Sequence, residues 1–120
     1  MAAPSPSSPS STAELLHARY AGRLPRAIDE LTGPTYGQVA LPLHIAWSGM
    51  RTYDLDPPRQ RMSLYRVVLA EGQRDDLVAF LDADLLLKQW PVLRTLVSRH
   101  IRTVWEEAFP ELADRASAAA

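Results

Sequence analysis

The sequence contains no cysteine, which excludes disulfide bonds and thiolate metal sites within the chain. Its 13 basic and 14 acidic side chains nearly cancel, so it lacks the one-sided basic field that is typical of nucleic-acid-binding proteins. No apolar run approaches the roughly 18 residues that a membrane-spanning helix needs. The first residues also lack Lys, Arg and an apolar stretch, so we expect no secretory signal and a soluble, cytoplasmic protein.

Signatures of catalysis are also scarce. Glycine occurs only five times, and these glycines form neither a phosphate-binding loop nor a G-x-S-x-G turn. His17, His44 and His100 lie far apart and lack metal-ligand companions, so we expect surface or half-buried polar residues and no cofactor. Asp82 and Asp84 could hold a metal for nucleotidyl transfer on a strand, but a helical pattern follows them. Helix capping explains both carboxylates, and we expect no enzymatic activity.

One stretch of the sequence alternates strictly between large apolar residues and small or polar ones. The apolar positions are Val39, Leu41, Leu43, Ile45 and Trp47. Alternation predicts an extended chain with one apolar face, and Pro42 places such a chain at an edge because it has no N–H. We favour an extended arm; the alternative is a hairpin that turns at Ser48-Gly49 and returns through residues 50–55.

An exposed edge with an apolar row invites another chain, so we expect this segment to bind a partner protein. Aromatic residues and Arg are the types that most often anchor such interfaces. The predicted contact residues are Leu43, Ile45, Trp47, Met50, Arg51 and Tyr53. For Trp47 the sequence leaves interface and core equally open, whereas Trp90 and Trp105 lie on helical apolar stripes that favour the core.

Beyond residue 55 the sequence predicts short helices. Asp56 and Pro57 are a suitable N-cap and first residue for a helix over residues 57–71, with a stripe of Met62, Tyr65 and Val68. Further helices are expected over residues 74–81 and, capped by Asp82, over 83–90. A last helix over 91–109 would be opened or kinked by Pro91 and ended by Pro110.

These patterns predict an all-α fold: a small helical domain of four to five short helices with an extended N-terminal arm. We expect a disordered Ala/Pro/Ser tail over residues 1–11, a helical segment over 12–33, an interaction domain over 39–112 and a frayed tail over 113–120. Ser11 and Glu14 have capping-box spacing, so a helix is expected to start near Thr12. The weaker alternative is that translation starts at Val39 and residues 1–38 do not belong to the protein.

Three segments carry a resemblance to a known family: Leu41–Gly49, Tyr53–Gly72 and Asp84–Arg94. They resemble small bacterial proteins encoded beside AbiEii/AbiGii-type nucleotidyltransferase toxins, and the resemblance covers residues 39–112. It implies an antitoxin that binds its toxin directly and blocks nucleotide transfer onto tRNA. The catalytic carboxylates would then belong to the toxin, and no active-site residue is carried over to this chain.

Two other functions stay open at this point. Arg94, Arg99 and Arg102 on the last predicted helix would suit a small dimeric DNA-binding regulator, although the balanced charge argues against it. A structural homo-oligomer is the third hypothesis. For an antitoxin, a homodimer is compatible with the sequence, and contact with nucleic acid is expected only in autoregulation.

Overall fold

The computed structural model describes residues 8–47 and 49–119. This part of the chain is mostly helical and contains one two-stranded sheet, so the all-α fold class is confirmed. The elements in chain order are α1 (Ser8–Ala21), the 3₁₀ helix η1 (Ile28–Glu30), β1 (Gln38–Ala40), β2 (Thr52–Asp54), α2 (Pro58–Glu71), α3 (Arg74–Phe80), α4 (Ala83–Leu93), α5 (Arg99–Ala108) and α6 (Pro110–Ala119). None of the helices described is long and apolar enough to cross a membrane.

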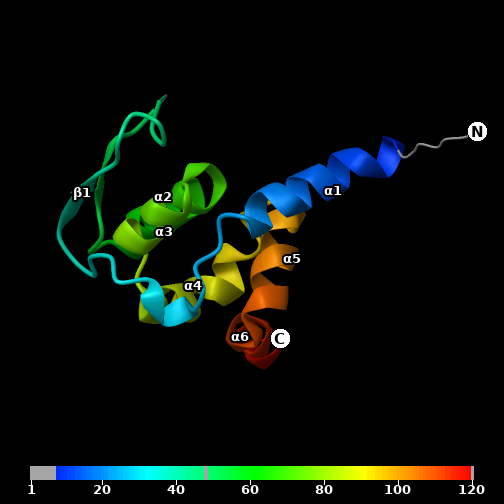
Figure 1. The fold of residues 1–120 in the computed structure, drawn as a ribbon. Coiled ribbons are helices and arrows are strands. Elements are labelled where there is room, and N and C mark those ends of the chain that lie inside the picture. Colours follow the sequence, from blue (N-terminus) through cyan, green and yellow to red (C-terminus); the bar gives the residue numbers. More distant parts are fainter. Residues whose placement is uncertain (1–7, 48, 120) are drawn as a thin grey trace, which may run out of the picture.

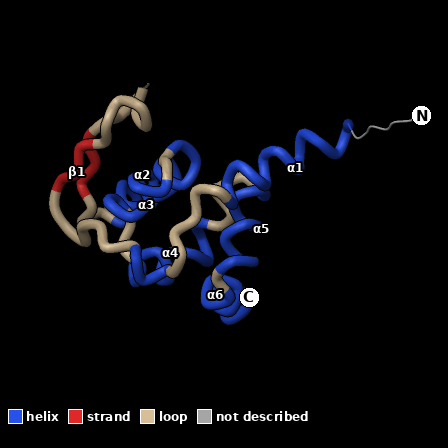
Figure 2. Tube along the Cα trace, viewed as in Figure 1, coloured by secondary structure: helices blue, strands red, loops and turns tan. Residues whose placement is uncertain are grey.

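The helices pack around α4, and two elements extend from this body. Helix α4 contacts α2, α6 and η1, while α5 contacts α1 and α6. The N-terminal part of α1 projects away from the body, and the β1–β2 hairpin projects on the opposite side (Figure 1). Most of the irregular chain belongs to this hairpin and to the connection that precedes it (Figure 2).

The core contains most of the residues that the helical stripes predicted, and Met62 is only partly buried against it. Trp90 on α4 and Trp105 on α5 are 0% and 2% exposed, which confirms their assignment to the core. On α2 the fully or nearly fully buried side chains are Leu64, Tyr65, Val68 and Leu69. Spacings of three and four residues put these side chains on one face of the helix, directed toward α3 and α4.

Residues 28–33, which the sequence placed in a helical segment over 12–33, also pack into this core. Ile28 and Leu31 are buried, and the backbone of Leu31 accepts a hydrogen bond from Ala83 N at 3.1 Å. Gly33 N donates to Leu81 O at 2.8 Å. A Cβ at Gly33 would lie 2.5 Å from the carbonyl carbon of Phe80, so only glycine permits this approach.

Several predicted helix ends are wrong. Helix α1 begins at Ser8, so residues 8–11 are helical; Pro9 is tolerated in a first turn, whose N–H groups have no helical partner. The rest of the predicted disordered tail, residues 1–7, lies outside the described residues. Helix α2 begins at Pro58, and Asp56 does not cap it, because its Oδ1 accepts from Gly37 N at 3.3 Å.

The predicted helix over 91–109 is two helices. Pro91 lies inside α4, which ends at Leu93, and Thr95 N then bonds back only three residues, to Val92 O at 3.0 Å. The Ser98 side chain caps α5 by accepting from Ile101 N at 3.3 Å. The Ser98 cap explains where α5 begins, whereas the missing N–H of Pro91 does not end α4, which continues for two more residues.

The prediction that a helix ends before Pro110 is confirmed, since α5 ends at Ala108, but the frayed tail expected after it is wrong. Pro110 is the first residue of α6, where its missing N–H has no cost. The helix continues to Ala119, so residues 113–119 are helical and not a frayed tail. Leu112 is 0% exposed, and Ala116 packs against the same core. Contacts with α4 and α5 therefore stabilise an Ala-rich sequence that was expected to fray.

Candidate protein-interaction surface on the hairpin loop

The segment that was expected to form an extended arm is one side of a hairpin. Strands β1 and β2 are antiparallel, and Val39 pairs with Tyr53. The pairing continues past both strands, with Leu41 N donating to Arg51 O at 2.7 Å and Leu55 N to Gly37 O at 2.9 Å. The favoured extended arm is therefore wrong, because the return segment supplies the hydrogen-bond partners that the arm would have lacked.

Residues 42–50, which we call the hairpin loop, do not follow the strict alternation. Ile45 N and Ala46 N both donate to Pro42 O, at 3.1 and 3.0 Å, so the chain turns here instead of staying extended. Pro42 opens this turn and does not mark a sheet edge. The predicted two-residue turn at Ser48-Gly49 includes Ser48, which lies outside the described residues; Gly49 has a φ of +87°.

The turn separates the apolar row into two groups. Ile45 and Ala46 point into the core and are 2% and 4% exposed. Leu43, Trp47 and Met50 point outward and are 64%, 73% and 53% exposed. We call these three exposed side chains the apolar tip. Trp47, which the sequence left open between core and interface, is thus on the surface.

The six predicted contact residues therefore fall into two sets. Leu43, Trp47, Met50 and Arg51 are exposed; the first three lie on the hairpin loop, and Arg51 directly follows it. Ile45 and Tyr53 are buried at 2% and 5% and are not accessible to a partner in this structure. The turn at Pro42 and the pairing of β2 direct these two side chains into the core, and their part in a contact stays a prediction.

The hairpin is fastened to the helices at both ends. At its base, Asp54 N donates to Gln60 Oε1 at 2.9 Å and Arg61 Nη1 donates to Leu55 O at 3.3 Å, which joins β2 to α2. In the loop, His44 Nε2 lies 2.7 Å from Asp76 Oδ2 on α3. Together with the buried Ile45, these contacts fix the direction in which the apolar tip points.

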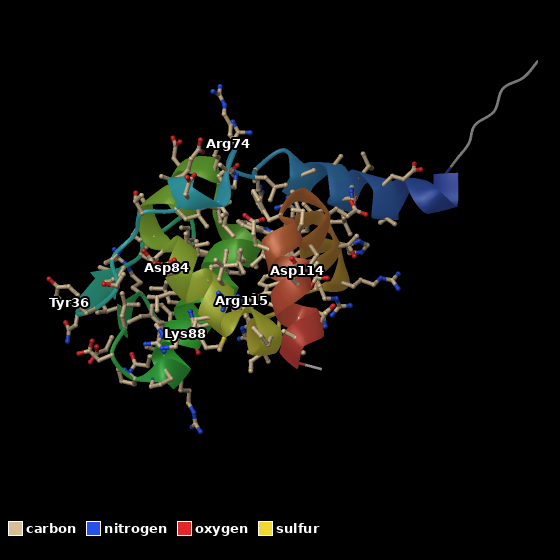
Figure 3. All side chains as sticks on the ribbon, turned by 90° about the horizontal axis from the view of Figure 1, so that it is seen from below. Tyr36, Arg74, Asp84, Lys88, Asp114 and Arg115 are labelled. Atoms are coloured by element: carbon tan, nitrogen blue, oxygen red, sulfur yellow. The ribbon has the colours of Figure 1, made fainter. Side chains whose placement is uncertain are left out.

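Other exposed apolar residues are separate from the tip. Tyr36, 78% exposed, precedes β1 and lies at the outer edge of the molecule (Figure 3). Leu15, 69% exposed, lies on α1.

Val92 and Leu96, at and beyond the end of α4, are 57% and 45% exposed. They line a groove with Arg59, Met62 and Arg66 that was not among the predicted sites. The only sequence signal for it is the spacing of these three α2 residues by three and four.

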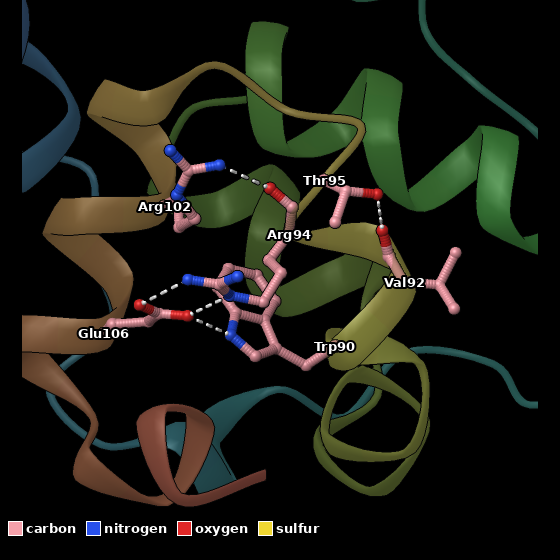
Figure 4. A network of polar contacts seen from close by, with 6 residues as sticks. All are labelled: Trp90, Val92, Arg94, Thr95, Arg102 and Glu106. Atoms are coloured by element: carbon pink, nitrogen blue, oxygen red, sulfur yellow. Dashed lines mark hydrogen bonds and ion pairs between the residues drawn. The ribbon is translucent and has the colours of Figure 1, made fainter. Parts of the chain in front are cut away.

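A network of polar side chains joins α4 to α5 (Figure 4). Glu106 Oε2 accepts from Trp90 Nε1 at 2.8 Å and from Arg94 Nε at 2.6 Å, while Arg94 Nη2 donates to Oε1 at 3.3 Å. Arg102 Nη1 donates to the backbone oxygen of Arg94 at 3.2 Å. Two of the three arginines that favoured a DNA-binding regulator thus make intramolecular contacts, which leaves that alternative with less support.

This network determines the charge state of its acidic residue. Burial alone would raise the pKa of the Glu106 carboxyl. The hydrogen bonds from Arg94 and Trp90 and the positive charges of Arg94 and Arg102 outweigh burial, so the pKa lies below its ordinary value. The hydrogen bond to Glu106 likewise raises the pKa of the Arg94 guanidinium. Glu106 is therefore ionised at neutral pH, and its role is structural.

The two aspartates that resembled a metal-binding pair are also accounted for by structure. Asp82 Oδ2 accepts from Leu85 N at 3.0 Å and caps α4, as predicted. Asp84 lies in the first turn of α4 and is exposed. Among the described residues, no group of three or more His, Asp or Glu side chains is arranged to hold a metal ion. That the protein is not an enzyme stays a prediction.

Comparison of the chain with protein-family models, with curated proteins and with solved structures finds no match in any of the three. The resemblance to the antitoxin family therefore stays a prediction.

Proposed function

We propose that this protein binds another protein through the apolar tip of its hairpin loop. The observation that supports the proposal is that Leu43, Trp47 and Met50, each more than half exposed, all lie on a single loop. Single exposed apolar residues are common, but a group that includes a Trp is typical of an interface. Burying these side chains against a partner removes apolar surface from water and favours the complex.

The attachment of the loop supports the same proposal. Ile45 is buried beneath the loop, His44 is held by Asp76, and Leu41 is paired with Arg51. Residues that are already held in place lose little conformational entropy when a partner binds. Arg51, exposed next to the tip, can add a charged contact at the rim, where such contacts steer association.

We further propose that the partner is a nucleotidyltransferase toxin and that the protein acts as its antitoxin. The support is the sequence resemblance, which includes residues 41–49 and thus most of the hairpin loop. In this proposal the chain performs no chemistry. It inhibits by occupying a surface that the toxin needs for nucleotide transfer onto tRNA, so the relevant quantity is the lifetime of the complex.

The experiment compares Trp47→Ser with Leu15→Ser, which changes an equally exposed apolar residue on α1. Each variant is co-expressed with the proposed partner, a nucleotidyltransferase toxin of the AbiEii/AbiGii type, and growth and co-purification are measured. Trp47→Ser should keep its helical circular dichroism and bind at least about 30-fold more weakly, because a central interface Trp commonly contributes about 2 kcal/mol or more. Leu15→Ser should neutralise the toxin like the parent protein.

Three outcomes would contradict the proposal. If Trp47→Ser neutralises the toxin as well as the parent, the apolar tip is not the contact surface. If both variants fail equally while remaining folded, the effect is not specific to the tip. If the parent protein does not bind the nucleotidyltransferase at all, the identity of the partner is wrong.

A further inference from the structure

The groove between α2 and the end of α4 is the second exposed apolar surface of the molecule. It has a volume of about 380 Å³. Met62, Val92 and Leu96 provide its apolar floor, and Arg59, Ser63 and Arg66 provide its polar side. None of these residues belongs to the hairpin loop.

The sequence positions explain why this surface is left uncovered. Arg59, Met62, Ser63 and Arg66 are spaced by three, one and three residues, so they follow one row along α2 at the edge of its core face, where Met62 is partly buried. The end of α4 at Leu93 leaves Val92 and Leu96 beside this row. Arg94 lies in the sequence between Val92 and Leu96. Its hydrogen bond to Glu106 holds the chain in place after α4.

We propose that this groove binds an amphipathic helical segment of a second polypeptide, with apolar side chains on the floor and carboxylates opposite Arg59 and Arg66. Charge complementarity is the argument for this occupant. Within the described residues, neither arginine forms an ion pair or side-chain hydrogen bond, and no acidic residue lines the groove. The two arginines are two helical turns apart, about 10 Å along the axis, so carboxylates at the same spacing on a facing helix would meet both.

A second copy of the chain fits this groove poorly. A two-fold contact centred on the row of α2 would place Arg59 of one copy against Arg66 of the other, and like charges facing each other oppose association. Nucleic acid also fits poorly, because affinity for it comes mainly from basic side chains that contact successive phosphates. This groove offers only two arginines beside an apolar floor. An acidic, amphipathic helix can place apolar side chains on the floor and carboxylates against the arginines of the polar side.

The probe is a pair of designed helical peptides of about 15 residues, each with a leucine stripe. One peptide carries Glu beside the stripe at positions seven apart, and the other carries Lys there. Each is titrated into the isotope-labelled full-length chain, and NMR chemical shifts identify the site. The Glu peptide should bind at the groove at least about tenfold more tightly than the Lys peptide, since two charge contacts together contribute about 1.4 kcal/mol.

Charge reversal provides the decisive comparison. The double variant Arg59→Glu/Arg66→Glu should lose the preference and bind the Lys peptide more tightly. The matched control is Lys88→Glu/Arg115→Glu, which changes net charge equally at exposed positions of α4 and α6 (Figure 3). The control should retain the preference for the Glu peptide, which excludes an effect of net charge.

Several results would overturn the proposal. These are the absence of binding by either peptide, equal affinity for both, and shifts that map to the hairpin loop instead of the groove. Dimerisation of the chain that is abolished by Leu96→Glu would assign the groove to a second copy. Displacement of the Glu peptide by a short DNA duplex would assign it to nucleic acid. The test does not involve Trp47 or the nucleotidyltransferase, so its outcome is independent of the function proposed above.

Discussion

The hydroxyl oxygen of Tyr65 on α2 accepts a hydrogen bond, 2.9 Å long, from the backbone N–H of Asp82. Asp82 in turn caps α4, so one buried side chain connects α2 with the junction between α3 and α4. Tyr65 is 0% exposed, and burial raises the pKa of its hydroxyl group to about 12. The contact holds together the helices that carry the groove.

The raised pKa of Tyr65 predicts a loss of stability in alkaline solution. The folded protein holds the phenolic proton more tightly than the unfolded chain, in which the pKa is about 10. The contribution is therefore complete below pH 10 and falls between about pH 10 and 12, by about 2–3 kcal/mol. Tyr65→Phe lacks this titration, so its free energy of unfolding should depend less on pH in that range.

Urea unfolding of both proteins measures this difference. At neutral pH, Tyr65→Phe should be less stable by about 1–3 kcal/mol, because Asp82 N–H loses its buried acceptor. The difference in free energy of unfolding between the two proteins should become smaller as the pH rises above 10. A constant gap would show that the Tyr65 hydroxyl does not titrate differently in the folded state.

The lowered pKa of Glu106 predicts the opposite dependence, in acid. The folded state keeps this carboxylate charged to a pH below its ordinary pKa of 4.5, so the stability that it contributes is complete above that pH and is lost as the pH falls through the lower folded value. Glu106→Gln should reduce the free energy of unfolding by about 1–3 kcal/mol at neutral pH, and the difference should narrow in acid.

Glu107 offers a matched control for this measurement. Its side chain is 66% exposed, and its contact with His17 is 3.6 Å long. Glu107→Gln should change stability by about 0.5 kcal/mol or less. Equal effects of the two substitutions would show that the contacts of Glu106 with Trp90 and Arg94 add no stability.

Helix α6 gives a third prediction. Leu112 is 0% exposed, so Leu112→Ala should cost about 2–5 kcal/mol of stability through lost burial and a cavity. Leu15→Ala, at a residue 69% exposed, should change stability by about 0.5 kcal/mol or less. The shift in the urea midpoint measures both. An unchanged midpoint for Leu112→Ala would mean that α6 does not pack as described.

The helices that the sequence predicts well are those in which local and tertiary signals agree. The stripe of Tyr65 and Val68 on α2 and the cap at Asp82 both follow from spacing and side-chain chemistry. Where tertiary contacts decide, the local signal is misleading. Residues 113–119 have the composition of a frayed end, and only the burial of Leu112 against α4 and α5 explains their helix.

In the candidate site, too, some features follow from the local sequence and others depend on tertiary contacts. Leu43, Trp47 and Met50 were identified from apolar character at an edge, and all three are exposed. The burial of Ile45 could not be read from alternation, because a turn inside the segment reverses which side of the chain faces the core. The groove was missed since it joins α2 to residues 92–96, and the break after α4 was not predicted.

The last prediction concerns the contact between His44 and Asp76, which are 2.7 Å apart and connect the hairpin loop to α3. His44→Ala removes this contact but leaves Ile45 and Ala46 in the core. Because the His44 side chain is 55% exposed, global stability should fall by about 1 kcal/mol or less. The loop should become more mobile, and hydrogen exchange at the Ile45 and Ala46 amides, which bond to Pro42 O, should accelerate.

A looser loop must be ordered on binding, so His44→Ala should weaken binding to the nucleotidyltransferase by about fivefold, which corresponds to about 1 kcal/mol. His44→Gln can still donate to Asp76 and should recover most of the affinity and of the protection from exchange. His100→Ala, on α5, is the control and should change neither property at the loop. If binding weakens while the exchange rates stay unchanged, His44 contacts the partner itself. If exchange accelerates without a loss of affinity, the order of the loop does not contribute to binding, and the apolar tip does not need to be held in place.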